Sequence, residues 1–215
     1  MERKIFLSPS SQTGNVYSYG NTNEAVQCGR IALACENALK RCGFAVKNEQ
    51  FDTLENRVES SNSWGADLHV PIHTNAFNGQ VSGTRILCYD LKGEGYRASQ
   101  AIFDALSPIT PGTSENIKTS TFYEILYSNA PCVYVEADFH DVPEVAKWII
   151  ENTDAIGEAI CKGICSYFGV LYAEPEEVLY RVQVGAFRNR DYADDFLKKV
   201  RAAGFPDAYI TQSKE

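Results

Sequence analysis

Residues 132–139, with the sequence Cys-Val-Tyr-Val-Glu-Ala-Asp-Phe, form the most apolar strand-like run of the chain and directly follow Pro131. A short apolar run rich in β-branched and aromatic residues predicts a buried strand. Further runs that predict strands lie upstream, at 4–7, 44–48, 67–73 and 82–89. Helix-like segments separate most of these runs. This alternation predicts an α/β fold, with a mostly parallel twisted sheet flanked by helices.

The sequence predicts four helices, the first from apolar residues that recur at intervals of three and four and the second from a polar pattern. They cover 23–42, 54–64, 96–106 and 141–168. Asp141 is expected to cap the last helix, with Pro143 in its first turn and Glu144 completing a capping box. Residues 108–120 are rich in Pro, Gly, Ser and Thr, which predicts a surface loop beside a site.

The chain is expected to divide into a large domain at 1–172, a linker at 173–177 and a small appendage at 178–215. The appendage has the pattern of a β-α-β fragment. Its predicted elements are a strand at 179–187, a helix at 191–203 and a strand at 207–211. A segment this short has too few residues for an independent core, so we expect it to rest on the large domain or on a partner.

The composition of the 215 residues excludes several classes of protein. A net charge of −8 argues against a general nucleic-acid binder. No apolar run approaches the roughly 20 residues that cross a bilayer, so we expect no membrane-spanning helix. The beginning of the chain contains no apolar stretch of signal-peptide length, so we expect synthesis in the cytoplasm.

The chain has seven cysteines, an odd number, and most of them lie in apolar helix or strand patterns. We therefore expect reduced thiols in the core. Cys161 and Cys165 are one helical turn apart, but the sequence offers no matching second pair. Their spacing alone favours core packing over metal binding. A cysteine nucleophile is also disfavoured, because an apolar environment opposes formation of the thiolate.

Polar groups gather at the carboxyl ends of the predicted strands, where ligands bind in an open α/β sheet. His73 and Asn75 end one strand, and Glu136 and His140 lie at the far end of another. Glu24 lies on the apolar stripe of the first helix, so its charge must be capped, paired or bound to a cation.

Each carboxylate has two interpretations. Glu24 either binds a cation or caps the backbone at Asn21, because Asn-x-x-Glu is the spacing of a capping box. Glu136 is either a buried carboxyl group with a raised pKa, as a general base requires, or the partner of Arg85 or Lys118 in a structural ion pair.

A site that uses histidine must draw on His69, His73 and His140, because the chain has only these three. The nearby carboxylates favour His73 as a metal ligand over an ordinary strand-end histidine. The strand pattern around Pro71 places His69 about 13 Å from His73, too far to share an ion. We therefore predict a structural role for His69.

Residues 4–170 resemble the zinc-dependent N-acetylmuramoyl-L-alanine amidases of the amidase-3 type. The first-strand motif of that family is matched by Leu7-Ser8-Pro9-Ser10-Ser11-Gln12, and the glutamate that opens its first helix by Glu24. The segment Pro71-Ile72-His73-Thr74-Asn75-Ala76 is similar to the motif of its second histidine. Val135-Glu136-Ala137-Asp138-Phe139 is similar to the strand of its catalytic glutamate.

The resemblance implies a peptidoglycan hydrolase that cleaves the amide between the lactyl group of N-acetylmuramic acid and L-alanine of the stem peptide. It implies Zn²⁺ as the cofactor, with Glu24 and His73 as ligands. It also implies that Glu136 acts as general base on zinc-activated water. Asn75 is expected to contact the substrate.

The chain departs from the family pattern at Ser11, where the family has its first metal-binding histidine, and serine is a poor zinc ligand. In one explanation His140 takes the missing place, which restores a set of two histidines and one glutamate. In another, Gln12 or water completes a weaker site. In the third, the domain is inactive and only binds peptidoglycan.

The end of the chain is similar to the first half of a SPOR (sporulation-related) repeat, on the strength of Tyr-Arg-Val-Gln-Val-Gly-Ala-Phe at 180–187 and Ala-Ala-Gly-Phe at 202–205. Full repeats of this kind bind glycan strands, so peptidoglycan is the expected partner. The fragment can also pair with its copy in a homo-oligomer. We expect the protein to act on the cell wall after release or lysis, as a phage-type endolysin or as a hydrolase freed from its host cell.

Overall fold

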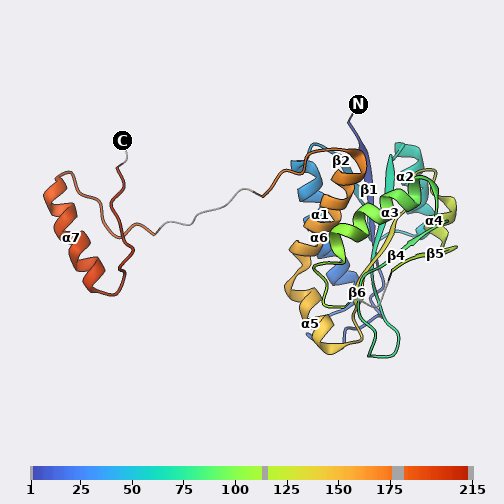
Figure 1. Cartoon of the computed structure of the whole chain (residues 1–215), viewed down its shortest axis with the longest axis horizontal. Helices are drawn as coiled ribbons and strands as arrows, with labels where there is room; N and C mark the ends of the chain where they lie inside the picture. The colour runs from blue at the N-terminus through green and yellow to red at the C-terminus, as the bar shows by residue number, and fades with distance from the viewer. Residues whose placement is uncertain (1, 113–115, 176–181, 213–215) are drawn as a thin grey trace. The chain divides into compact units, whose positions relative to one another are not determined.

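The computed structural model describes residues 2–112, 116–175 and 182–212 (Figure 1). The chain forms two compact units, Met1–Pro175 and Glu176–Glu215. The boundary between them falls inside the segment 173–177 that the sequence predicts as a linker. No helix in the described part of the chain is long and apolar enough to cross a membrane.

The first unit is built on one six-stranded sheet with the order β2-β1-β3-β6-β4-β5. Its strands are β1 (Lys4–Pro9), β2 (Ala45–Asn48), β3 (Leu68–Asn75), β4 (Arg85–Cys88), β5 (Ile117–Thr119) and β6 (Tyr134–Phe139). Neighbouring strands run parallel except for β4 and β6, which are antiparallel. The predicted α/β fold with a mostly parallel sheet is therefore confirmed.

Helices cover both faces of this sheet (Figure 1). They are α1 (Glu24–Arg41), α2 (Leu54–Trp64), α3 (Gly93–Leu106), α4 (Tyr123–Tyr127), α5 (Pro143–Glu151) and α6 (Thr153–Phe168). Helix α6 packs against both α1 and α3, and α2 packs against α4. Two glycines let helix α6 lie close to its neighbours. A Cβ atom at Gly157 would meet the backbone of α1, and a Cβ atom at Gly163 would meet the backbone of α3. Any larger residue there would force the helices apart.

Successive side chains of β1 point to opposite faces of the sheet, so this strand shows what each face contains. Ile5 and Leu7 are fully buried in the main core, which they share with the apolar stripes of α1, α3 and α6. Phe6 points the other way, and its ring stacks on His69 at a centroid distance of 5.1 Å. The face that carries Phe6 and His69 is covered by α2 and α4, through Ser61 and Glu124.

The predicted long helix at 141–168 is wrong, because the chain forms α5 and α6 with a break at Asn152. The Asn152 side chain donates to the carbonyl of Trp148, and its backbone N–H donates to that of Ile149. Such local bonds compete with helix continuation. Asp141 is not the cap of α5 either, since its Oδ2 accepts the backbone N–H groups of Phe77 and Gly79.

The segment 108–120, predicted as a loop, contains the edge strand β5. Ile117 pairs with Ile86 of β4, so the sheet extends one strand further than the sequence pattern indicates. Three residues are a short edge strand, which apolar periodicity does not detect. Residues 113–115 of the segment lie outside the described residues.

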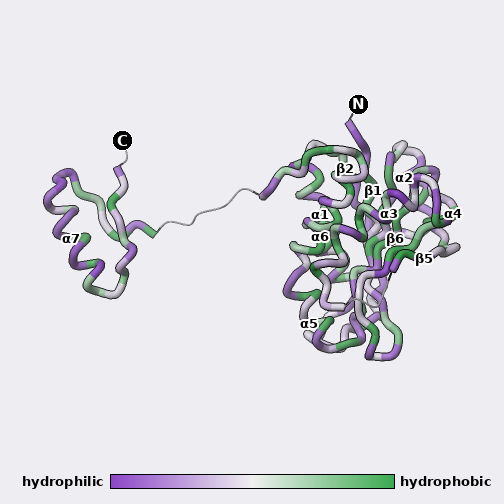
Figure 2. The backbone as a smooth tube through the Cα atoms, viewed as in Figure 1, coloured by the Kyte–Doolittle hydropathy of each residue, from purple (hydrophilic) through white to green (hydrophobic). Residues whose placement is uncertain are grey.

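The second unit contains the predicted helix, α7 (Arg190–Ala202), but neither predicted strand forms within the described residues 182–212. Residues 179–181 of the first predicted strand lie outside this range. Helix α7 buries none of its residues and is largely hydrophilic (Figure 2). Val182 and Val184 are exposed as well. A pair of strands with so little apolar surface to cover it is only marginally stable in water.

A buried polar network joins β1 and β3 to α2 and α4. His69 is fully buried, and its Nδ1 and Nε2 bond to Ser61 Oγ at 2.9 Å and to Glu124 Oε1 at 3.2 Å. Ser8 also donates to Glu124. These contacts agree with the structural role that the sequence predicts for His69. Burial by itself raises the pKa of Glu124, but the bonds and charges of His69, Ser8 and Arg57 outweigh it and lower that pKa.

This network predicts how stability depends on acid. A carboxyl group whose pKa is lower in the folded state stabilises the fold at neutral pH, and this contribution is lost as the pH falls through the folded pKa. We expect Glu124→Gln to lower the free energy of unfolding at neutral pH by about 1–3 kcal/mol, because buried partners lose a charged acceptor. Urea denaturation at a series of pH values measures this effect.

The same series should show a shallower acid decline for Glu124→Gln than for the wild type. Glu144→Gln is the matched control, because Glu144 is exposed on α5. A variant with wild-type stability and a wild-type acid decline would contradict the role of the network.

Candidate active site

The core of the site is a buried contact between α1 and β3. Glu24 is the first residue of α1, and its Oε1 lies 2.8 Å from Nδ1 of His73. Asn23 caps the helix through its own side chain, which accepts the N–H of Val26. The cap interpretation of Glu24 is therefore wrong. The Glu24 carboxylate instead points toward β3, where it meets the predicted metal ligand His73.

Further donors hold the Glu24 carboxylate in its charged form. Asn15 Nδ2 donates to Oε2 at 2.5 Å, and the backbone N–H of Thr74 lies 3.5 Å from Oε1. Burial alone raises the pKa of Glu24, but the bonds from His73, Asn15 and Ser10 and the His73 charge outweigh it and lower that pKa. At the carboxyl end of β3, a buried, ionised carboxylate thus lies beside an imidazole.

His73 keeps one ring nitrogen that is not engaged with Glu24. Its Nε2 is buried and has no hydrogen-bond partner among the described residues. The ring is fixed by stacking on Tyr134 at a centroid distance of 4.4 Å. The side chain is therefore held rigidly, as a metal ligand must be.

Strand pairing places Glu136 beside His73 and beside Arg85, across three neighbouring strands. Paired residues of adjacent strands project to the same face, so the three side chains share one face. Asn75 donates its amide N–H to Glu136, and Arg85 Nη1 lies 3.7 Å from Glu136 Oε2. The Glu136 side chain is 13% exposed, so solvent can reach it. The structure therefore includes the predicted pairing with Arg85.

His140 occupies a separate place from the Glu24–His73 contact. Its Nδ1 lies 2.9 Å from Thr74 Oγ1, and its ring stacks on Tyr17 at 4.8 Å. Burial lowers the pKa of His140, so the ring is neutral at neutral pH. Among the described residues, only a set of cysteines brings three His, Cys or carboxylate ligand atoms within 4.8 Å of one another. The structure therefore does not gather His140 with Glu24 and His73.

The donor set fits two positions of a zinc site. Zinc binds imidazole nitrogen and carboxylate oxygen at about 2.0–2.2 Å, so two such atoms on one tetrahedral ion lie about 3.3 Å apart. Nδ1 of His73 and Oε1 of Glu24 lie 2.8 Å apart, about 0.5 Å closer than that spacing. Ser11, which stands where the family has a histidine, offers only a hydroxyl group.

Sequence patterns gave little indication of the residues that position the side chains of this site. Asn15 lies in the loop before α1, and no spacing rule relates it to Glu24. Tyr17 and Thr74 bond to each other and hold His140 between them. A polar residue directly after His73 is the one indication that the sequence offers for Thr74.

Two family models match the chain. Residues 9–166 match the family described as N-acetylmuramoyl-L-alanine amidase, and residues 176–215 match the SPOR domain. A sporulation-specific N-acetylmuramoyl-L-alanine amidase of Bacillus subtilis is 26% identical, over 94% of this chain and 82% of its own length. The N-acetylmuramoyl-L-alanine amidase CwlM of Bacillus licheniformis is also 26% identical, over 96% and 84%.

Solved structures show the same fold. The catalytic domain of the amidase CwlV from Bacillus (Paenibacillus) polymyxa superposes with a TM-score of 0.69 at 18% identity, covering 78% of this chain and 99% of that one. The amidase AmiC2 of Nostoc punctiforme gives a TM-score of 0.71 at 21% identity, covering 78% and 97%. This family is generally zinc-dependent. Because the family model spans most of the first unit, the chain belongs to the N-acetylmuramoyl-L-alanine amidase family and carries a SPOR domain after it.

Proposed function

We propose that this protein hydrolyses the amide between the lactyl group of N-acetylmuramic acid and L-alanine of the peptidoglycan stem peptide. One observation carries the proposal beyond family membership: Glu24 contacts His73, and Glu136 is the strand-pairing neighbour of His73. Strand register places Glu136 directly beside His73. This is the arrangement that amide hydrolysis needs, with ligand-type groups next to a solvent-accessible carboxylate.

Glu24 and His73 would hold the zinc ion in this proposal. When bound, zinc polarises a carbonyl group and lowers the pKa of a water molecule. Two sources for the rest of the ligand set remain open. His140 supplies an imidazole from the same sheet edge, whereas Gln12 or water would complete a weaker site.

Glu136 is proposed as the general base. Its carboxylate takes a proton from the attacking water and returns it to the leaving amine of L-alanine. Asn75 donates to Glu136 and thereby fixes its orientation, so we propose that Asn75 positions the base as well as contacting substrate. Arg85, at 3.7 Å, complements the negative charge that Glu136 carries before it accepts the proton.

We expect Glu136→Gln to lower the release of stem peptides by about 10²–10⁴-fold, because glutamine cannot accept the proton. The bound zinc should not change, since Glu136 is not among the proposed ligands. Mass spectrometry of digested peptidoglycan, with and without chelator, measures the release. Glu151→Gln is the control, because Glu151 is an exposed glutamate of α5. Full activity of Glu136→Gln would contradict the assignment.

The zinc ligands can be tested separately by metal analysis. We expect Glu24→Gln and His73→Asn each to weaken zinc binding at this site at least about tenfold. Loss of a residue that only hydrogen-bonds to a metal ligand already lowers metal affinity by about tenfold or more, and these variants change the ligands themselves. The measurement is zinc per chain after dialysis against a weak chelator. His140→Ala distinguishes the two completions: it lowers zinc only if His140 is a ligand. Unchanged zinc in Glu24→Gln would contradict the site.

Ser11 favours a second candidate function, a protein that binds peptidoglycan without cleaving it. A site with two strong ligands holds zinc less tightly than one with three. Sedimentation with purified cell walls, without release of stem peptides by wild-type protein at saturating zinc, would favour this function. Release that depends on Glu136 would exclude it.

The SPOR domain is proposed to bind the glycan strands and so hold the first unit on its substrate. Exposed apolar side chains in this unit, among them Val182, Phe205 and Tyr209, offer a surface on which a second copy of the chain can pair. We further propose that the protein is made in the cytoplasm and acts after release or lysis. All seven cysteines are free thiols, which agrees with synthesis in a reducing compartment.

A further inference from the structure

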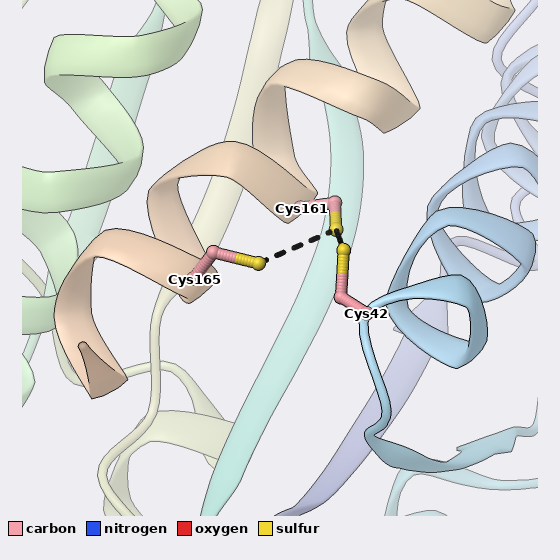
Figure 3. Close-up of side chains that lie close together, drawn as sticks. All are labelled: Cys42, Cys161 and Cys165. Carbon is pink, nitrogen blue, oxygen red and sulfur yellow. Dashed lines mark hydrogen bonds between the residues drawn. The ribbon is translucent and has the colours of Figure 1, made fainter. Parts of the chain in front are cut away.

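Three cysteine thiols meet where α1 ends against α6 (Figure 3). Cys42 is the C-cap residue of α1, and Cys161 and Cys165 lie one turn apart on α6. The sulfur of Cys161 lies 3.8 Å from that of Cys42 and 3.9 Å from that of Cys165. The fold therefore supplies the additional ligand that the pair on α6 lacks in the sequence.

The spacing of the three sulfurs fits one shared ion. Zinc binds thiolate sulfur at about 2.3 Å, so two sulfurs on one tetrahedral ion lie about 3.8 Å apart. All three sulfurs lie within 4.8 Å of one another. A disulfide needs about 2.05 Å between sulfurs, and the cysteines are free thiols. An ion can thus enter without a movement of the helix backbones.

The surroundings of the cluster suit a bound cation. Cys42 is half-buried and gives access from solvent, whereas Cys161 and Cys165 are buried. The backbone N–H of Ala173 lies 3.3 Å from the Cys42 sulfur, which stabilises a thiolate there. The hydrogen bond with Cys161 lowers the pKa of Cys165, whereas burial raises the pKa of Cys42 and the bond with Cys165 raises that of Cys161, so the ion itself must displace the protons of these two thiols.

We propose that Cys42, Cys161 and Cys165 form a metal site for a thiolate-binding d¹⁰ cation, with Zn²⁺ as the physiological candidate. Thiolates select zinc over hard cations such as Mg²⁺ and Ca²⁺. On binding, each thiol that is still protonated releases its proton to solvent, and water fills the fourth position. The ion joins the end of α1 to the last turns of α6. This site is independent of the proposed amidase activity, since it contains neither Glu24 nor His73.

Cadmium titration of the full, reduced chain tests the site, because sulfur-to-cadmium charge transfer absorbs in the ultraviolet and nitrogen or oxygen ligands give no such band. We expect the band to saturate at one equivalent. Cys42→Ser should weaken binding at least about tenfold, because a hydroxyl replaces one of three thiolates. Cys42 is the cysteine to replace because it is half-buried and caps a helix. Serine fits at this position without leaving a cavity.

Cys88→Ser is the matched control, because Cys88 is a buried cysteine on β4 outside the cluster. It should keep the band, as should Glu24→Gln. Zinc should also raise the midpoint of thermal unfolding in Glu24→Gln, which lacks a ligand of the proposed active-site zinc, and this shift should be lost when Cys42→Ser is added to Glu24→Gln but kept when Cys88→Ser is added instead. Absence of the band in wild type, or an unchanged band in Cys42→Ser, overturns the proposal and leaves the thiols as core packing.

Discussion

Strand β6 lies between a parallel partner, β3, and an antiparallel one, β4. Its register determines which side chains lie together in the candidate active site. Pairing places Glu136 beside His73 on one side and beside Arg85 on the other. Its neighbours Val135 and Ala137 point to the opposite face, where they are fully buried in the main core. A slip of one residue would turn Glu136 into the apolar core and these apolar groups toward His73 and Arg85, so the core itself fixes the position of the base.

Elements whose own residues carry their pattern could be predicted from the sequence. The apolar stripe of α1 and the polar pattern of α2 are local features, and both helices form where they were expected. The alternation of strands and helices gave the α/β fold for the same reason. The tail shows the limit of this reasoning, because Val182 and Val184 alternate as in a strand but form none within the described residues 182–212. A strand exists only with its neighbour.

Contacts between distant segments could not be predicted in this way. Asn15 reaches Glu24 and Cys42 reaches Cys161 only because the fold brings their elements together. His140 shows the converse. It is near Glu136 in sequence, but its backbone N–H donates to Asn75 and its ring is fixed by Tyr17 and Thr74. Proximity along the chain therefore did not make it part of the Glu24–His73 contact.

Helix α1 separates two donor sets of different chemistry. Glu24 begins the helix and Cys42 caps its end, and a rise of 1.5 Å per residue puts about 27 Å between them. One set offers imidazole and carboxylate at the sheet edge, and the other offers only sulfur. Since ligand type and geometry select metals, the thiol set would hold a soft cation tightly, whereas the imidazole and carboxylate of the other set suit a hydrolytic zinc ion. An ion at the thiols would brace α1 against α6 at one end, leaving the other end to present Glu24.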